Sequence, residues 1–309
     1  WDTAHRYLGH QLKVIRQVSS HTIDSYRDCL NSFIDYLERV ENISRKKISF
    51  HNFGKETIKR YQTWMITEQG LAPKTCNLRL TAIRSFLEYA AQEYLWLMPV
   101  YTDACTIAGV KTPNHAIEYF EPDEMTALLA APSGTSRTDR RNQMMLIFLY
   151  DTAARVAEAR QVKVSDLHLD AGVPYVTLLG KGRKYRNIPL MEKTVLHLKR
   201  YLKDFHGSDP KTDLPLFYAK AHGLLHELSS DTFEKMIKRY AEQCREGGYP
   251  MPDRVHCHMI RKTRAMDLYR EGVPLPHIQQ LLGHENISTT SGFYAFATLD
   301  VLAKAMEAV

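Results

Sequence analysis

His258-Met259-Ile260-Arg261, followed by Gly283-His284 and then by Tyr294, carries the most information about this chain. A second arginine, Arg155, lies far upstream in the segment Asp151-Thr-Ala-Ala-Arg-Val-Ala-Glu158. Arginine is permanently charged and can donate to two phosphate oxygens at once. Histidine can transfer protons near neutral pH, and tyrosine can act as a covalent nucleophile. These residue types, in this order, suit chemistry on a phosphodiester.

Four segments together resemble the tyrosine recombinases, the family that includes phage integrases, chromosome-dimer resolvases and conjugative-transposon integrases. Thr152-Ala-Ala-Arg155-Val-Ala-Glu158 resembles the first arginine box of that family. Gly180-Lys181-Gly182-Arg-Lys184-Tyr-Arg186-Asn-Ile-Pro189 resembles its lysine-bearing hairpin. Residues 258–261, together with Leu281-Leu282-Gly283-His284 and the following tyrosine, resemble its C-terminal signature. Each motif alone is weak, but four in this order are specific, and the resemblance spans roughly residues 20–309.

Hydrophobic periodicity predicts a mainly α-helical protein with a small β-sheet. Apolar residues recur at helical spacing in several segments. Helices are expected at residues 20–38, 57–68, from Pro73 onward, 121–129 and 139–153, with an amphipathic tail at 299–308. The β signal is a hairpin, in which Val173–Leu179 and Tyr185–Leu190 flank a glycine-rich turn.

The same patterns predict two domains. Residues 1–106 are expected to form a helical domain, and residues 118–309 a mixed α/β domain that ends in a tail helix. The resemblance implies that the first is the core DNA-binding domain and the second the catalytic domain. Residues 107–117 contain Gly and Pro without sustained periodicity, which is typical of a linker. The resemblance implies that the two domains form a C-shaped clamp around DNA.

Composition places few limits on function. The chain has 309 residues, of which 44% are hydrophobic and 25% charged, as in globular proteins of one or two domains. The net charge of +6 permits a nucleic-acid partner without requiring one. Five scattered cysteines argue against a disulfide framework and for a reducing compartment. The resemblance implies that this compartment is the bacterial cytoplasm.

The ends of the chain and its hydropathy give further expectations. No apolar run approaches the roughly 18 residues that span a bilayer, so no membrane association is expected. The chain starts at Trp1 and shows no signal peptide. It is therefore expected to be a fragment or a processed form, which leaves room for a preceding arm-binding domain.

No metal ion or other cofactor is expected. His256-Cys257-His258 has no second cluster at zinc-ligand spacing, and the site residues include no carboxylate cluster for two metal ions. A phosphotyrosyl link would conserve the energy of the broken diester, so ATP is not required.

The resemblance implies specific roles for the candidate catalytic residues. The two arginines would clamp the scissile phosphate, Lys181 would protonate the leaving 5′ oxygen, and Tyr294 would form a 3′-phosphotyrosyl link. The histidines would donate to the phosphate, and Glu158 would support the local architecture. The full set is Arg155, Lys181, His258, Arg261, His284 and Tyr294.

Each of these residues also has an ordinary interpretation. Arg155 with Glu158 is compatible with a surface ion pair, and the two histidines with structural roles. Lys181 is compatible with a solvated hairpin tip, in which case Lys184 or Arg186 could contact phosphates instead. The order of the motifs favours the catalytic interpretation.

The chain departs from the family pattern at three places. Ala153 stands where the family usually has glycine, and Lys262 stands where it more often has histidine. The commonest spacing after the glycine-histidine pair would place the nucleophile at Phe293, one residue before Tyr294. Either the chain has a one-residue insertion, or Phe293 has replaced the nucleophile.

DNA is the expected partner, as a duplex with paired recombination sites. Lys74 and Arg79 lie on the helix from Pro73, away from its apolar stripe, and could contact phosphates or base edges or simply be solvated. The resemblance implies a homotetramer linked by exchange of C-terminal tails, a four-way junction and service to a mobile element. Accessory DNA-bending proteins are compatible with it.

Two other functions compete with recombination. A type IB topoisomerase-like enzyme would use similar chemistry to relax supercoils without joining partners. A catalytically silent DNA-binding regulator becomes the better hypothesis if Phe293 replaced the nucleophile.

Overall fold

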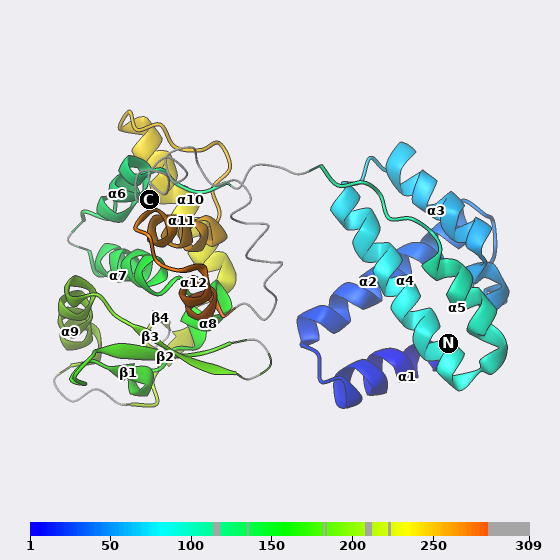
Figure 1. Cartoon of the computed structure of the whole chain (residues 1–309), viewed down its shortest axis with the longest axis horizontal. Coiled ribbons are helices and arrows are strands. Elements are labelled where there is room, and N and C mark those ends of the chain that lie inside the picture. Colours follow the sequence, from blue (N-terminus) through cyan, green and yellow to red (C-terminus); the bar gives the residue numbers. More distant parts are fainter. Residues whose placement is uncertain are drawn as a thin grey trace, which may run out of the picture. The chain divides into compact units, whose positions relative to one another are not determined.

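A computed structural model describes residues 1–113, 118–134, 136–180, 182, 184–207, 212–221 and 224–283 of the chain (Figure 1). The chain divides into two compact units, Trp1–His115 and Ala116–Val309, and each has its own hydrophobic core. Helices dominate both units, and the strands form two small sheets. The predicted fold class, mainly α with little β-structure, is therefore confirmed.

The first unit is helical throughout its described secondary structure. Its elements are α1 (Asp2–Arg6), the π-helix η1 (Tyr7–Ile15), α2 (Ser20–Arg39), the 3-10 helices η2 (Arg45–Lys47) and η3 (Phe50–Phe53), α3 (Lys55–Thr67), α4 (Pro73–Glu93), the 3-10 helix η4 (Leu95–Leu97) and α5 (Met98–Cys105). Ser19 caps α2, because its hydroxyl accepts a hydrogen bond from the backbone N–H of Thr22 at 3.2 Å. Pro73 begins α4 at a position where its missing N–H costs nothing.

The segment predicted as the start of the linker is held by the helices of this unit. Asn77 on α4 exchanges two hydrogen bonds with the backbone of Val110, at 2.9 and 2.7 Å. Gln62 on α3 donates to the carbonyl of Ala108 at 2.9 Å, and the side chain of Ile107 is buried. The helical unit therefore extends beyond residue 106. These contacts join distant parts of the sequence, so periodicity alone did not predict them.

The second unit combines helices with two small antiparallel sheets, and the three-stranded sheet lies at one edge of the unit (Figure 1). Its elements are α6 (Pro122–Ala130), α7 (Arg137–Thr152), α8 (Val156–Gln161), the 3-10 helix η5 (Val164–Asp166), β1 (Leu167–His168), β2 (Tyr175–Leu179), β3 (Tyr185–Pro189), α9 (Glu192–His206), β4 (Tyr218–Ala221), β5 (Leu224–Glu227), α10 (Ser230–Glu246), α11 (Cys257–Arg270) and α12 (Leu275–Leu282). The predicted hairpin is β2–β3, paired from Tyr175 opposite Pro189 to Leu179 opposite Tyr185. Strands β1, β4 and β5 were not predicted, because segments this short carry little alternation.

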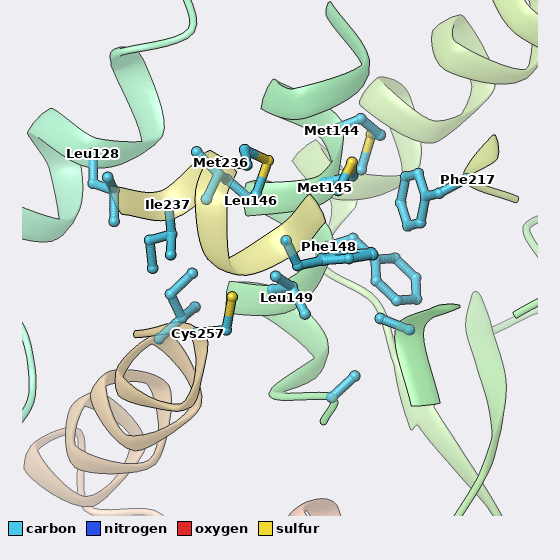
Figure 2. Close-up of a cluster of buried hydrophobic side chains, with 14 of the residues drawn as sticks. Leu128, Met144, Met145, Leu146, Phe148, Leu149, Phe217, Met236, Ile237 and Cys257 are labelled. Atoms are coloured by element: carbon cyan, nitrogen blue, oxygen red, sulfur yellow. The ribbon is translucent and has the colours of Figure 1, made fainter. Parts of the chain in front are cut away.

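Helix α7 lies at the centre of the core of this unit (Figure 2). Met144, Met145, Phe148 and Leu149 of α7 are all buried, and the helix contacts α6, α8, α9 and α11. The second half of α7 is apolar on every side, and a helical segment of this kind is expected to be buried. The C-terminal end of α7 is therefore a rigid point from which the next turn starts.

That turn is made by Ala153, the residue that stands in place of the family's glycine. Its backbone is left-handed, with φ of 48° and ψ of 29°, and its methyl group is fully buried. A non-glycine residue rarely adopts this conformation, because its Cβ approaches the following carbonyl oxygen. The turn places Arg155 two residues later, as the N-cap of α8.

Substitutions at Ala153 should show how strongly the turn constrains the chain. Ala153→Gly stabilises the fold by relieving about 1–2 kcal/mol of left-handed strain. It destabilises the fold by losing a buried methyl group, about 0.8 kcal/mol, and by raising the conformational entropy of the unfolded chain, about 0.4–1 kcal/mol. Its unfolding free energy is expected to stay within about 1 kcal/mol of the original. Ala153→Val should lose more than about 2 kcal/mol through strain and overpacking. Urea unfolding of both variants measures this, and a valine variant as stable as the parent would contradict the assigned turn.

Candidate active site

One buried carboxylate, that of Glu158, joins the first arginine box to the hairpin. Arg186 on β3 binds it with two parallel hydrogen bonds, from Nη1 to Oε1 at 2.8 Å and from Nη2 to Oε2 at 2.7 Å. Arg155 donates to Oε1 from Nη1 and to Oε2 from its backbone N–H, both at 2.8 Å. The Glu158 side chain is only 4% exposed. Both oxygens of this carboxylate are thus satisfied by arginines.

Burial and the arginine partners shift the pKa of Glu158 in opposite directions. Burial alone would raise it, whereas the hydrogen bonds and charges of Arg186 and Arg155 lower it. The arginines prevail, and the pKa falls from its ordinary value of 4.5 to about 2. Glu158 is therefore fully ionised at neutral pH, where it offsets part of the positive charge of the site.

Three arginines also cap the C-terminal end of α12. Arg186 donates from Nε to the carbonyl of Leu281 at 3.0 Å, and Arg155 donates from Nη2 to that of Gly283 at 3.3 Å. Arg261 donates from Nη2 to the carbonyl of Leu282. The last carbonyls of a helix lack partners within the helix and lie at the negative end of its dipole, so cations stabilise them. We call Arg155, Arg186 and Arg261 on these carbonyls the three-arginine cap.

Arg261 is the most deeply buried member of the cap, at 2% exposure. Its Nη1 donates to the carbonyl of Ala153 at 2.6 Å, so its guanidinium joins the left-handed turn to the end of α12. Burial, followed by repulsion from Arg155, lowers its pKa to about 9, although the charge of Glu158 opposes this shift. The guanidinium remains protonated at neutral pH.

His258 lies one helical turn before Arg261, in the first turn of α11. Its ring reaches solvent, yet the surrounding protein atoms and the charges of Arg261, Lys262, His256 and Arg155 lower its pKa to about 4. His258 is therefore neutral at pH 7 and can donate one hydrogen bond and accept another. The carboxylate of Glu234 supports this end of α11, because both its oxygens lie 3.3 Å from the backbone nitrogen of Cys257.

The structure brings Arg155, Arg261 and His258 together, as the motifs predicted. Arg155 and Arg261 bind adjacent carbonyls of one helix end, and the charges of both lower the pKa of His258. Lys181, His284 and Tyr294 lie outside the described residues, as does Phe293. Their proposed roles remain predictions.

The central role of Arg186 was not predicted, because its motif suggested only an alternative phosphate contact. Its side chain is 12% exposed, and its guanidinium is bound to Glu158 and Leu281. Two glycines in the motifs were the available signal. A Cβ on Gly283 would lie 3.1–3.3 Å from three atoms of Arg186, and one on Gly180 would lie 3.2 Å from its Nη1. Both glycines leave room for this guanidinium.

The two predicted DNA contacts in the first unit differ in their surroundings. Lys74 is exposed in the first turn of α4. Arg79 is half-buried, and its charge opposes the rise in pKa that burial causes at Tyr61 and Cys29. Arg79 thus lies against neighbouring helices, in contrast to the expected position away from the apolar stripe.

Neither a metal-binding cluster nor a membrane-spanning helix is found in the part of the chain that the structure describes. Within it, no three His, Cys, Asp or Glu side chains are grouped so that they could hold a metal ion. None of its helices is both long and apolar enough to cross a bilayer.

Comparison with known sequences gives matches over most of the chain. Residues 118–298 match the Phage integrase family, and residues 5–94 match the Phage integrase, N-terminal SAM-like domain. The chain is 33% identical over 285 residues to tyrosine recombinase XerD of Halalkalibacterium halodurans. This alignment covers 91% of this chain and 89% of that protein. It is 29% identical over 306 residues to tyrosine recombinase XerC of Xanthomonas campestris. That alignment covers 98% of this chain and 86% of the XerC chain.

Comparison with solved structures gives the same fold. The XerH site-specific recombinase, bound to a palindromic difH substrate in a post-cleavage complex, aligns with a TM-score of 0.72 and 20% identity, covering 94% of this chain and 80% of that one. The Tn1549 transposon integrase, in complex with a circular intermediate DNA, aligns with a TM-score of 0.71 and 18% identity, covering 99% of both chains.

Proposed function

Because the chain belongs to the phage integrase family of tyrosine recombinases, we propose that it cuts and rejoins duplex DNA at paired specific sites through a covalent bond between Tyr294 and a 3′ phosphate. The convergence of Arg155 and Arg261 at the end of α12, beside a neutral His258, carries this proposal. The XerH and Tn1549 integrase structures contain DNA, which supports a duplex as the substrate.

In the proposed reaction, the phenol oxygen of Tyr294 attacks phosphorus and gives its proton to a base, for which the neutral ring of His258 is available. The bond from phosphorus to the 5′ oxygen breaks, and this oxygen leaves as a hydroxyl after taking a proton from Lys181 or a histidine. Arg155 and Arg261 offset the charge that develops on the pentavalent phosphate. The 5′ hydroxyl of a partner strand then attacks the phosphotyrosine and releases Tyr294. Two such rounds pass through a four-way junction.

DNA binding is proposed to be shared by both units, with four copies of the chain assembled through their C-terminal tails. Another solved structure with this fold is a lambda integrase tetramer bound to a Holliday junction, which supports such an assembly. The charge of +6 suits a polyanionic partner. The recombination is proposed to move a mobile element, with or without accessory DNA-bending proteins.

Lys74 is proposed to contact a phosphate, because it is exposed in the first turn of α4. Lys74→Ala is expected to reduce the slope of log binding constant against log salt by about 1. Salt titration of duplex binding measures this slope. Lys59→Ala is the control, because Lys59 is an exposed lysine that pairs with Glu56 at 2.9 Å. An unchanged slope for Lys74→Ala would remove this residue from the interface.

A nicked suicide duplex tests the main proposal, because loss of a short fragment traps the covalent intermediate. Candidate element ends would be screened with the unaltered chain, and the adduct would be mapped by mass spectrometry. We expect it on Tyr294, and we expect Tyr294→Phe to abolish it while leaving DNA binding intact. Tight binding without an adduct would favour the silent regulator, and Phe293→Tyr would then test the other register. Plasmid relaxation without recombinant product would favour the topoisomerase.

A further inference from the structure

Arg186 occupies a position between three segments that are distant in the sequence. It lies on β3, binds Glu158 on α8 and binds the carbonyl of Leu281 at the end of α12. Glu158 precedes it by 28 positions, and Leu281 follows it by 95. One side chain thus connects the hairpin, the first arginine box and the end of α12.

The guanidinium of Arg186 is already bound by other groups of the protein. All three of its nitrogens donate within the protein, and the side chain is 12% exposed. Arg155 differs, because its side chain is 34% exposed and its bond to Gly283 is long, at 3.3 Å. Of these two arginines, Arg155 is therefore the one placed to meet a phosphate.

The geometry connects Arg186 to Arg155 through one atom. Oε1 of Glu158 accepts from Nη1 of both arginines, at 2.8 Å each. The two parallel bonds from Arg186 fix the plane of the carboxylate, since a guanidinium and a carboxylate match in this geometry. A fixed carboxylate plane in turn fixes the direction from which Arg155 can donate.

We infer that Arg186 is a positioning residue for strand cleavage: it orients Arg155 through Glu158, and holds the end of α12, without contacting the phosphate itself. This inference rests on the proposed function. Lysine cannot replace it, because an ammonium group cannot make two parallel bonds to one carboxylate while also reaching Leu281.

Arg186→Lys tests this inference, with cleavage and binding measured separately. We expect the single-turnover cleavage of prebound suicide duplex to slow by about 100-fold, as small displacements of catalytic groups do. We expect the dissociation constant to change less than about 3-fold. The salt slope of binding is measured on Arg186→Gln, which removes the charge that a phosphate contact would need, and we expect it to remain unchanged. A slope lower by about 1 for Arg186→Gln, or unaltered cleavage by Arg186→Lys, would overturn the inference.

Two further variants separate positioning from folding. Gly180→Ala keeps every charge but places a methyl group 3.2 Å from Nη1 of Arg186 and 3.3 Å from the carbonyl oxygen of Lys184. It should therefore slow cleavage with binding intact even if Arg186→Lys fails to fold. Arg141→Lys is the control, because Arg141 is a half-buried arginine that donates to the carbonyl of Tyr218 at 3.3 Å. It should change thermal stability without changing the cleavage rate. Cleavage by Gly180→Ala at the parental rate would contradict the inference.

Failure of the inference is distinguishable from failure of the proposed function. If the unaltered chain forms no adduct, the proposed function fails whatever the variants do. If it forms an adduct and Arg186→Lys forms it equally fast, only the inference fails. Arg155→Lys in the Arg186→Lys background adds a third measurement, because residues that act as a unit should have less than additive effects. Fully additive effects would show that Arg186 acts independently of Arg155.

Discussion

Replacing Glu158 with glutamine is expected to lower the free energy of unfolding by about 3–5 kcal/mol at neutral pH, because it leaves the clustered guanidiniums of Arg155, Arg186 and Arg261 without their buried counterion. Glu158 is 4% exposed and accepts hydrogen bonds from both Arg155 and Arg186. Glutamine keeps the size of the side chain but loses its charge and one of its two acceptors. Three guanidiniums would then lie together at the end of α12, and no carboxylate would offset their charge.

The pH dependence of this effect has a definite sign. A carboxyl group whose pKa falls from 4.5 to about 2 on folding contributes on the order of 3 kcal/mol. That contribution is complete above pH 4.5 and is lost as the pH falls through about 2. The difference in stability between the parent and Glu158→Gln should therefore shrink on acidification.

Urea unfolding at pH 7 and at pH 3 measures both parts of this prediction. Glu242→Gln is a suitable control, because Glu242 is 60% exposed and pairs with Arg245 one turn along the same helix. Its effect should be within about 0.5 kcal/mol. Equal stability of Glu158→Gln and the parent at pH 7 would show that the arginines need no counterion.

Replacing Arg261 with alanine is expected to slow strand cleavage by about 10²–10³-fold, as loss of one donor to a developing anion does. It should also destabilise the fold, because the buried carbonyls of Ala153 and Leu282 lose a donor. Each unsatisfied carbonyl costs about 1–3 kcal/mol. Arg155→Ala should slow cleavage similarly at a smaller cost in stability, since that side chain is one-third exposed.

Single-turnover cleavage and thermal unfolding of the two alanine variants give the comparison. The expected pattern is a shared loss of rate and a larger loss of stability for Arg261→Ala. A fast Arg261→Ala enzyme would exclude this residue from the phosphate site. Equal stabilities would mean that the two carbonyls find other partners, and the three-arginine cap would then be less important for folding than its geometry indicates.

Local signals in the sequence predicted helices α2, α3, α4, α6 and α7 and the main hairpin. The periodic apolar residues of α2 and α4 and the glycine-rich turn before β3 each act within one segment, so their outcomes could be predicted. The docking of Val110 on Asn77 and the pairing of Arg186 with Glu158 depend on residues far apart in the chain. Motif spacing identified Arg155, His258 and Arg261 but did not distinguish a phosphate contact from a supporting ion pair at Arg186.

The three-arginine cap also determines when the site can form during synthesis of the chain. Arg155 and Gly283 are separated by 128 positions, Arg186 and Leu281 by 95, and Arg261 and Leu282 by 21. Contacts of such long sequence separation form late, because the intervening chain must first be ordered. A nascent chain that has not yet released α12 from the ribosome holds its arginines without their helix partner. The three-arginine cap therefore cannot be completed before α12 has emerged, however early the other elements of the second unit fold.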